Sequence, residues 1–60
     1  MNMKSIAVYV TINEEFLIVY KKITETIPCF ADLGIDDDFV HIMCRYEDAP
    51  YVERMLAPFV

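Results

Sequence analysis

Hydrophobic and polar positions change their period several times along this 60-residue chain, and each change predicts a different element. The stretch Phe39–Tyr46 carries β-branched and aromatic residues at a period of two, which is typical of a β-strand. Both of its alternating sets contain apolar side chains, which indicates a central strand with protein packed on each side. We therefore expect the fold to be organised around this strand.

Two further strands are predicted earlier in the chain. Ser5–Ile12 alternates strictly, with β-branched side chains along one of its faces. Pro28–Ile35 alternates less regularly, and a proline at its start suits an edge strand, where a missing N–H donor is tolerated. The three aspartates Asp36–Asp38 then form the turn of a hairpin that leads into Phe39–Tyr46.

The segment between the first two strands predicts a helix. Asn13 suits the N-cap, and Glu14 and Glu15 follow where the helix dipole favours negative charge. Phe16–Ile27 has the β propensity of a second hairpin arm at its start, but its apolar side chains recur at helical spacing, which favours a helix. Pro28 ends this helix.

A second helix is predicted after the central strand. Asp48 is its expected N-cap, and Pro50 lies in its first turn, where proline is tolerated. Pro58 ends it. Its apolar stripe consists of Val52, Met55, Leu56 and Phe59.

Two hairpin registers keep the apolar faces together. A two-residue loop, Asp36–Asp37, sets Cys29 opposite Cys44, whereas a four-residue loop, Asp36–Phe39, sets Ala31 opposite Cys44. Asp-Asp lacks the glycine that tight two-residue turns prefer. We therefore predict the longer loop.

The predicted order β-α-β-β-α makes residues 1–60 a single small α+β domain. It resembles a ferredoxin-like βαββαβ sandwich without its last strand, over most of the chain and without a signature motif. The resemblance implies a three-stranded antiparallel or mixed sheet of order 1-3-2, with two helices on one face. It also implies that Ser5–Ile12 is an exposed edge, and a long apolar edge strand invites pairing with another chain.

Composition points to a partner. Apolar residues make up 57% of the chain, which is more than one small core easily covers. A second copy, most simply a homodimer, or another protein would cover the surplus. The net charge of −5 disfavours nucleic acid and anionic membranes and suits a basic protein surface.

The chain carries no motif that predicts catalysis or a cofactor. Acidic residues at one end lack the glycine spacing of a calcium loop, so we predict no metal. His41 and Cys44 are three apart on a strand and face opposite sides, which disfavours zinc and a nucleophile–base pair. There is no signal peptide or membrane-span pattern, and two cysteines make no disulfide scaffold, so we expect a cytoplasmic protein with free thiols.

These observations predict a small acidic, non-enzymatic, protein-binding regulator that acts as a homodimer. Inhibitors, antitoxin-like neutralisers and adaptors, including those of phages and plasmids, share this size and charge. The alternative is a dimeric regulatory domain that holds a small ligand at the subunit interface. RNA stacking on the open face is disfavoured by the missing basic residues, so we expect this face to pack against a second sheet.

The predicted binding residues form two groups. Those for self-association are Val8, Tyr9, Val10, Phe30, Phe39, His41 and Met43. Those for a basic partner are Glu14, Glu15, Asp36, Asp37 and Asp38.

Overall fold

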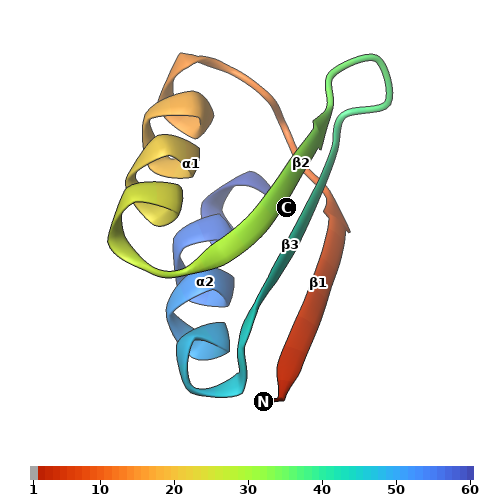
Figure 1. Ribbon diagram of the computed structural model, residues 1–60. Coiled ribbons are helices and arrows are strands. Elements are labelled where there is room, and N and C mark those ends of the chain that lie inside the picture. The colour runs from red at the N-terminus through yellow and green to blue at the C-terminus, as the bar shows by residue number, and fades with distance from the viewer. Residues whose placement is uncertain (1) are drawn as a thin grey trace.

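A computed structural model describes residues 2–60 and shows a two-layer α+β fold, with one sheet and two helices on one of its faces (Figure 1). The elements in chain order are β1 (Met3–Tyr9), α1 (Glu14–Thr26), β2 (Cys29–Gly34), β3 (Phe39–Arg45) and α2 (Ala49–Leu56). Short 3₁₀ turns, Tyr46–Asp48 and Ala57–Phe59, precede and follow α2. The predicted α+β class and element order are confirmed.

The sheet has the order β1-β3-β2, and both of its pairings are antiparallel. β3 is therefore the central strand, as predicted, and β1 is an edge. This arrangement is compatible with a ferredoxin-like sandwich that lacks its last strand. β1 spans Met3–Tyr9 rather than the predicted Ser5–Ile12, because its partner β3 extends only from Phe39 to Arg45.

The predicted hairpin register is wrong. Cys29, not Ala31, lies opposite Cys44, and Gly34 lies opposite Phe39. The turn between the strands contains four residues, 35–38. Its last residue, Asp38, has a φ of 52°, a left-handed conformation that aspartate tolerates better than most residues. A four-residue turn without glycine thereby gives the register that the sequence pattern associates with the shorter loop.

The helix caps differ from each other. Asn13 caps α1 as predicted, because its side-chain oxygen accepts a hydrogen bond of 2.8 Å from the Phe16 N–H. Asp48 occupies the N-cap position of α2, but its carboxylate makes no capping bond there. The predicted N-cap position of Asp48 is therefore correct, but the expected hydrogen bond from its carboxylate to the first turn of α2 does not form. The carboxylate instead accepts a hydrogen bond of 3.0 Å from Arg45 Nε.

The core lies between the sheet and the helices. Its centre is the helix-facing side of β3, where Val40, Ile42 and Cys44 are completely buried. Both predicted helix stripes face it. The other buried residues are Ile6, Val10, Phe16, Ile23, Ala49, Val52, Leu56 and Phe59.

Candidate functional site

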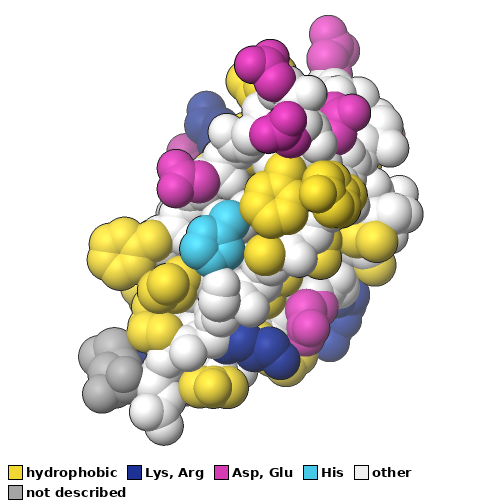
Figure 2. All heavy atoms as spheres, turned by 90° about the vertical axis from the view of Figure 1, so that its right-hand side faces the viewer, with side chains coloured by type: hydrophobic (Ala, Val, Ile, Leu, Met, Phe, Trp, Pro, Cys, Tyr) yellow, Lys and Arg dark blue, Asp and Glu magenta, His cyan; other side chains and the backbone are white. Residues whose placement is uncertain are grey.

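Within residues 2–60, both helices lie on one face of the sheet and the opposite face carries none. Figure 2 shows this open face, with the histidine among hydrophobic side chains and most of the visible acidic side chains gathered toward one end. The open face is made by alternate residues of the three strands. They are Met3, Ser5, Ala7 and Tyr9 of β1, Phe30 and Asp32 of β2, and Phe39, His41, Met43 and Arg45 of β3.

Two aromatic side chains of the open face are largely exposed. Tyr9 is 72% exposed and Phe30 is 75% exposed, which is unusual for such large apolar groups. The Tyr9 and Phe39 rings pack edge to face, with centroids 5.2 Å apart. Phe30 lies opposite Met43. The structure therefore brings together five of the residues that the sequence predicts for self-association.

The other two predicted interface residues lie elsewhere. Val8 of β1 is half-buried on the helix-facing side, and Val10, which follows β1, is buried. Neither side chain belongs to the open face. Val8 could contribute to an interface only along the edge of β1.

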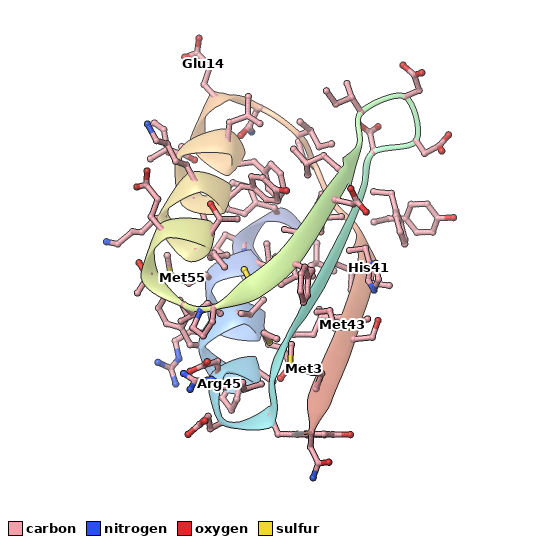
Figure 3. All side chains as sticks on the ribbon, in the orientation of Figure 1. Met3, Glu14, His41, Met43, Arg45 and Met55 are labelled. Carbon is pink, nitrogen blue, oxygen red and sulfur yellow. The ribbon has the colours of Figure 1, made fainter. Side chains whose placement is uncertain are left out.

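His41 lies at the middle of the open face, and Figure 3 shows it on the side of the sheet away from the helices. Its neighbours across the strands are Ala7 on β1 and Asp32 on β2. Its Nε2 shares a hydrogen bond of 2.6 Å with Ser5 Oγ. Sequence reasoning misses this contact, because it depends on the β1–β3 register.

A serine–histidine hydrogen bond is also the core of a nucleophile–base pair. Such a pair needs an orienting third group and a pocket for the substrate. Within residues 2–60, no hydrogen bond or ion pair joins Asp32 to His41. Two grooves on the surface of the described residues are lined by other side chains. The bond therefore fixes the position of the imidazole on the open face.

Arg45 is the only basic residue among those that form the described open face. Its Nε lies 3.0 Å from an Asp48 carboxylate oxygen and 3.4 Å from one of Glu47. These two acidic residues neutralise the guanidinium, so the face offers little free positive charge to a phosphate.

The predicted acidic cluster lies at one end of the molecule. Asp36, Asp37 and Asp38 are exposed in the β2–β3 turn, and Figure 1 shows this turn at the same end as the start of α1. Glu14 and Glu15 are exposed in the first turn of α1, and Figure 3 shows Glu14 projecting from it. We call these five residues the acidic end.

The turn that carries the aspartates is anchored to the rest of the sheet. The Val10 N–H donates a hydrogen bond of 2.8 Å to the Asp38 carbonyl, and the Asp37 N–H donates one of 3.2 Å to the Gly34 carbonyl. In the part of the chain that the structure describes, no carboxylate of the acidic end forms an ion pair. In the same part, no group of three or more acidic, histidine or cysteine residues is placed to hold a metal ion.

The two cysteines lie directly opposite each other on the helix-facing side, as free thiols. Burial, and then the nearby Asp48 carboxylate, raises the pKa of both thiols. A raised pKa lowers the thiolate fraction, so both are weak nucleophiles near neutral pH. His41 is on the other face of β3, as the predicted alternation requires.

Two of the grooves on the described surface lie beside the sheet. One, of about 340 Å³, lies between β1 and the α2 region and is lined by Ile6, Val8, Glu53, Leu56, Ala57 and Val60. The other, of about 420 Å³, is lined by Met3, Pro28, Cys29, Phe30 and Arg45. Both are mostly apolar and open to the surface.

Comparison with protein-family models, with curated proteins and with solved structures found no match to this chain. Among the described residues, no helix has the length and apolar character needed to cross a membrane. The open face, the β1 edge and the acidic end are the exposed features from which a function is proposed.

Proposed function

We propose that this protein is a non-enzymatic regulator that binds another protein through its acidic end and acts as a homodimer. The observation that carries the proposal is the acidic end itself. Its five carboxylates are exposed and lack ion-pair partners within residues 2–60. Free carboxylates on one surface attract a basic protein and orient its approach.

The geometry of the turn supports this role. Asp36 and Asp37 project from a short turn that hydrogen bonds hold to the sheet, so binding requires little further ordering of the backbone. Interactions of this kind are weakened by salt, because the charges are exposed. Two opposing thiols without a disulfide fit the reducing cytoplasm that we propose as the compartment.

The bare sheet supports self-association. An open face with Tyr9 and Phe30 more than two-thirds exposed, beside an edge strand without proline, presents apolar area and unpaired backbone groups together. Soluble monomers rarely leave such surfaces uncovered. A second copy joined at this edge would cover its unpaired backbone groups in the working protein.

Charge-neutral variants test the acidic end. Asp36→Asn/Asp37→Asn removes two charges there and leaves Asp38, whose left-handed backbone shapes the turn. Glu25→Gln/Glu47→Gln removes the same charge outside the acidic end and serves as the control. We expect a partner captured by the wild type and the control, then purified, to bind the Asp variant at least about tenfold more weakly at low salt. Equal affinities for all three proteins would contradict the proposal.

One observation favours the alternative function, a small ligand held between subunits. The groove of about 420 Å³ includes Met3 and Phe30 of the open face, so a second subunit on that face would close it. Its volume falls in the range of small-molecule sites. A metabolite that raises the melting temperature equally in the wild type and in Asp36→Asn/Asp37→Asn would support this alternative.

A further inference from the structure

β1 has a neighbouring strand, β3, on one side, and its other side is a free edge within the described residues. The Val10 N–H donates to Asp38, which continues the β1–β3 pairing beyond Tyr9. In an antiparallel pair, backbone groups point alternately toward one neighbour and the other. Even-numbered residues of β1 therefore point their N–H and C=O toward β3, and Ser5, Ala7 and Tyr9 point theirs toward the free edge.

A second hydrogen bond agrees with this alternation and shows an odd-numbered N–H bonded on the side away from β3. Thr11 is odd-numbered, and its N–H donates a bond of 2.7 Å to the Phe59 carbonyl. Phe59 thus occupies one position beside the edge, just beyond the end of β1. Along Met3–Tyr9, no residue of the described chain forms a neighbouring strand on this side.

We infer that the vacant edge is filled by β1 of a second copy, in an antiparallel joint whose twofold axis passes through Ile6. This inference rests on the homodimer of the proposed function and specifies how it forms. Ile6 is the middle residue of Met3–Tyr9, so this register overlaps the two strands completely. It places Ser5 of one copy opposite Ala7 of the other, and each such pair exchanges two N–H···O=C bonds.

Side chains at the joint are complementary. Lys4 is the only charged residue of β1, so no like charges meet along the paired strands. In this register Lys4 of one copy lies opposite Val8 of the other. Val8 lines the groove of about 340 Å³ together with Glu53, so each ammonium group approaches a carboxylate of the other copy. The apolar lining of the groove also becomes covered.

The overall charge distribution favours the same joint. Each copy carries a net charge of −5, and its acidic end lies beside the C-terminal end of β1, where Val10 meets Asp38. Antiparallel β1 strands point these ends in opposite directions. A seven-residue strand is about 23 Å long, well beyond the Debye length of about 8 Å at physiological salt. Repulsion is thus minimised, and the dimer presents two acidic ends for two partner molecules.

A cysteine pair tests the register directly. In the proposed joint, Ser5 and Ala7 of different copies have Cα atoms about 5.5 Å apart, within the range of a disulfide. Two Ser5 residues are diagonal and too far apart. When oxidised glutathione is added to a mixture of Ser5→Cys and Ala7→Cys, we expect a disulfide to link one copy of each variant. Either variant alone should form no disulfide-linked homodimer. Wild type controls for Cys29 and Cys44.

A proline variant tests the edge independently. The Ala7 N–H points away from β3, so Ala7→Pro removes no hydrogen bond within the subunit. We expect it to remain folded by circular dichroism and to raise the dimer dissociation constant more than about tenfold, because the ring blocks the joint. Ala7→Thr keeps the N–H and should dimerise like the wild type. Light scattering across a dilution series measures both.

A charge swap tests the contact between Lys4 and Glu53. Lys4→Glu or Glu53→Lys alone should raise the dissociation constant by about three- to tenfold, and the double variant should restore it.

A dimer that survives Ala7→Pro and gives no covalent heterodimer would overturn the β1 joint in favour of packed open faces. A wild type that stays monomeric would overturn the joint and the homodimer together. Partner binding by the acidic end would then still be tested by the charge-neutral variants described above.

Discussion

The two faces of β3 differ although they belong to one seven-residue strand. On the helix-facing side, Val40, Ile42 and Cys44 have no exposed area. On the open side, Phe39, His41 and Met43 keep part of their surface in contact with solvent. Both faces carry apolar side chains, and the open face also carries His41 and Arg45. Alternation alone therefore predicts which residues share a face, and the placement of the helices decides which face becomes the core.

The difference determines how much each face contributes to the stability of the fold. Residues on the covered face contribute burial within the subunit, which a 60-residue domain needs because its total stability is small. Residues on the open face contribute to the fold mainly through their backbone. Substitutions on the two faces should consequently affect different measurements.

The largest expected difference is between Ile42→Ala and Met43→Ala. These neighbours have side chains on opposite faces of β3. Ile42→Ala should lower the free energy of unfolding by about 2–5 kcal/mol, because it leaves a cavity in the core. Met43→Ala should lower it by about 1 kcal/mol or less. Urea denaturation measures both, and similar losses would show that the open face is also covered in the folded protein.

The next largest effect is a loss of stability at alkaline pH, caused by a thiol on the covered face. Burial, and then Asp48, raises the pKa of the Cys44 thiol in the folded state. The thiol therefore keeps its proton to higher pH when folded than when unfolded. Its contribution to stability is complete below the unfolded pKa, near 9.0, and is lost as the pH rises through the folded pKa.

Urea titrations at several pH values above neutrality measure this effect. Tyr20 and Cys29 also have raised pKa values, so their deprotonation lowers the free energy of unfolding at alkaline pH as well. Cys44→Ala should be less stable near neutral pH but should show a shallower decline above about pH 9. An unchanged slope in this variant would mean that Cys44 does not contribute to the alkaline loss.

The helices that cover the core offer a smaller contrast. Asn13→Ala should lower the stability by about 1 kcal/mol, because the Phe16 N–H loses its partner. Asp48→Ala removes no cap and only a partly exposed interaction with Arg45, so about 0–1 kcal/mol is expected. Thermal melts of the two variants rank them. A larger loss for Asp48→Ala would indicate that the Arg45 interaction is stronger than its exposure suggests.

Most of the fold can be predicted because local patterns determine it. Period-two alternation identifies the three strands, helical spacing separates Phe16–Ile27 from a hairpin arm, and shared apolar faces give the layers. The hairpin register cannot be predicted in the same way. Both registers satisfy the pattern, and the choice depends on the left-handed backbone of Asp38, which is a property of one residue in its turn.

The candidate site divides similarly. Strand alternation by itself predicts that Phe30, Phe39, His41 and Met43 share the open face. The bond between Ser5 and His41 requires the pairing of β1 with β3, which no local pattern contains. Val10 is predicted for self-association, yet it continues the alternation of Ile6 and Val8, whose side chains face the helices. Its burial follows from this alternation, which the hydrogen bond between Val10 and Asp38 continues past Tyr9.

The smallest expected effect on folding is that of the exposed aromatic Phe30. Phe30→Ser should change the free energy of unfolding of the subunit by no more than about 0.5 kcal/mol, because the ring is 75% exposed and adds little burial. If the second copy joins through β1, the dimer dissociation constant should also stay within about twofold, since Phe30 lies on the strand at the opposite edge of the sheet. If the open faces pack together instead, the loss of this large ring should weaken the dimer strongly. Light scattering and urea denaturation of this one variant therefore distinguish the two uses of the sheet, and its lack of effect on folding is what makes the result interpretable.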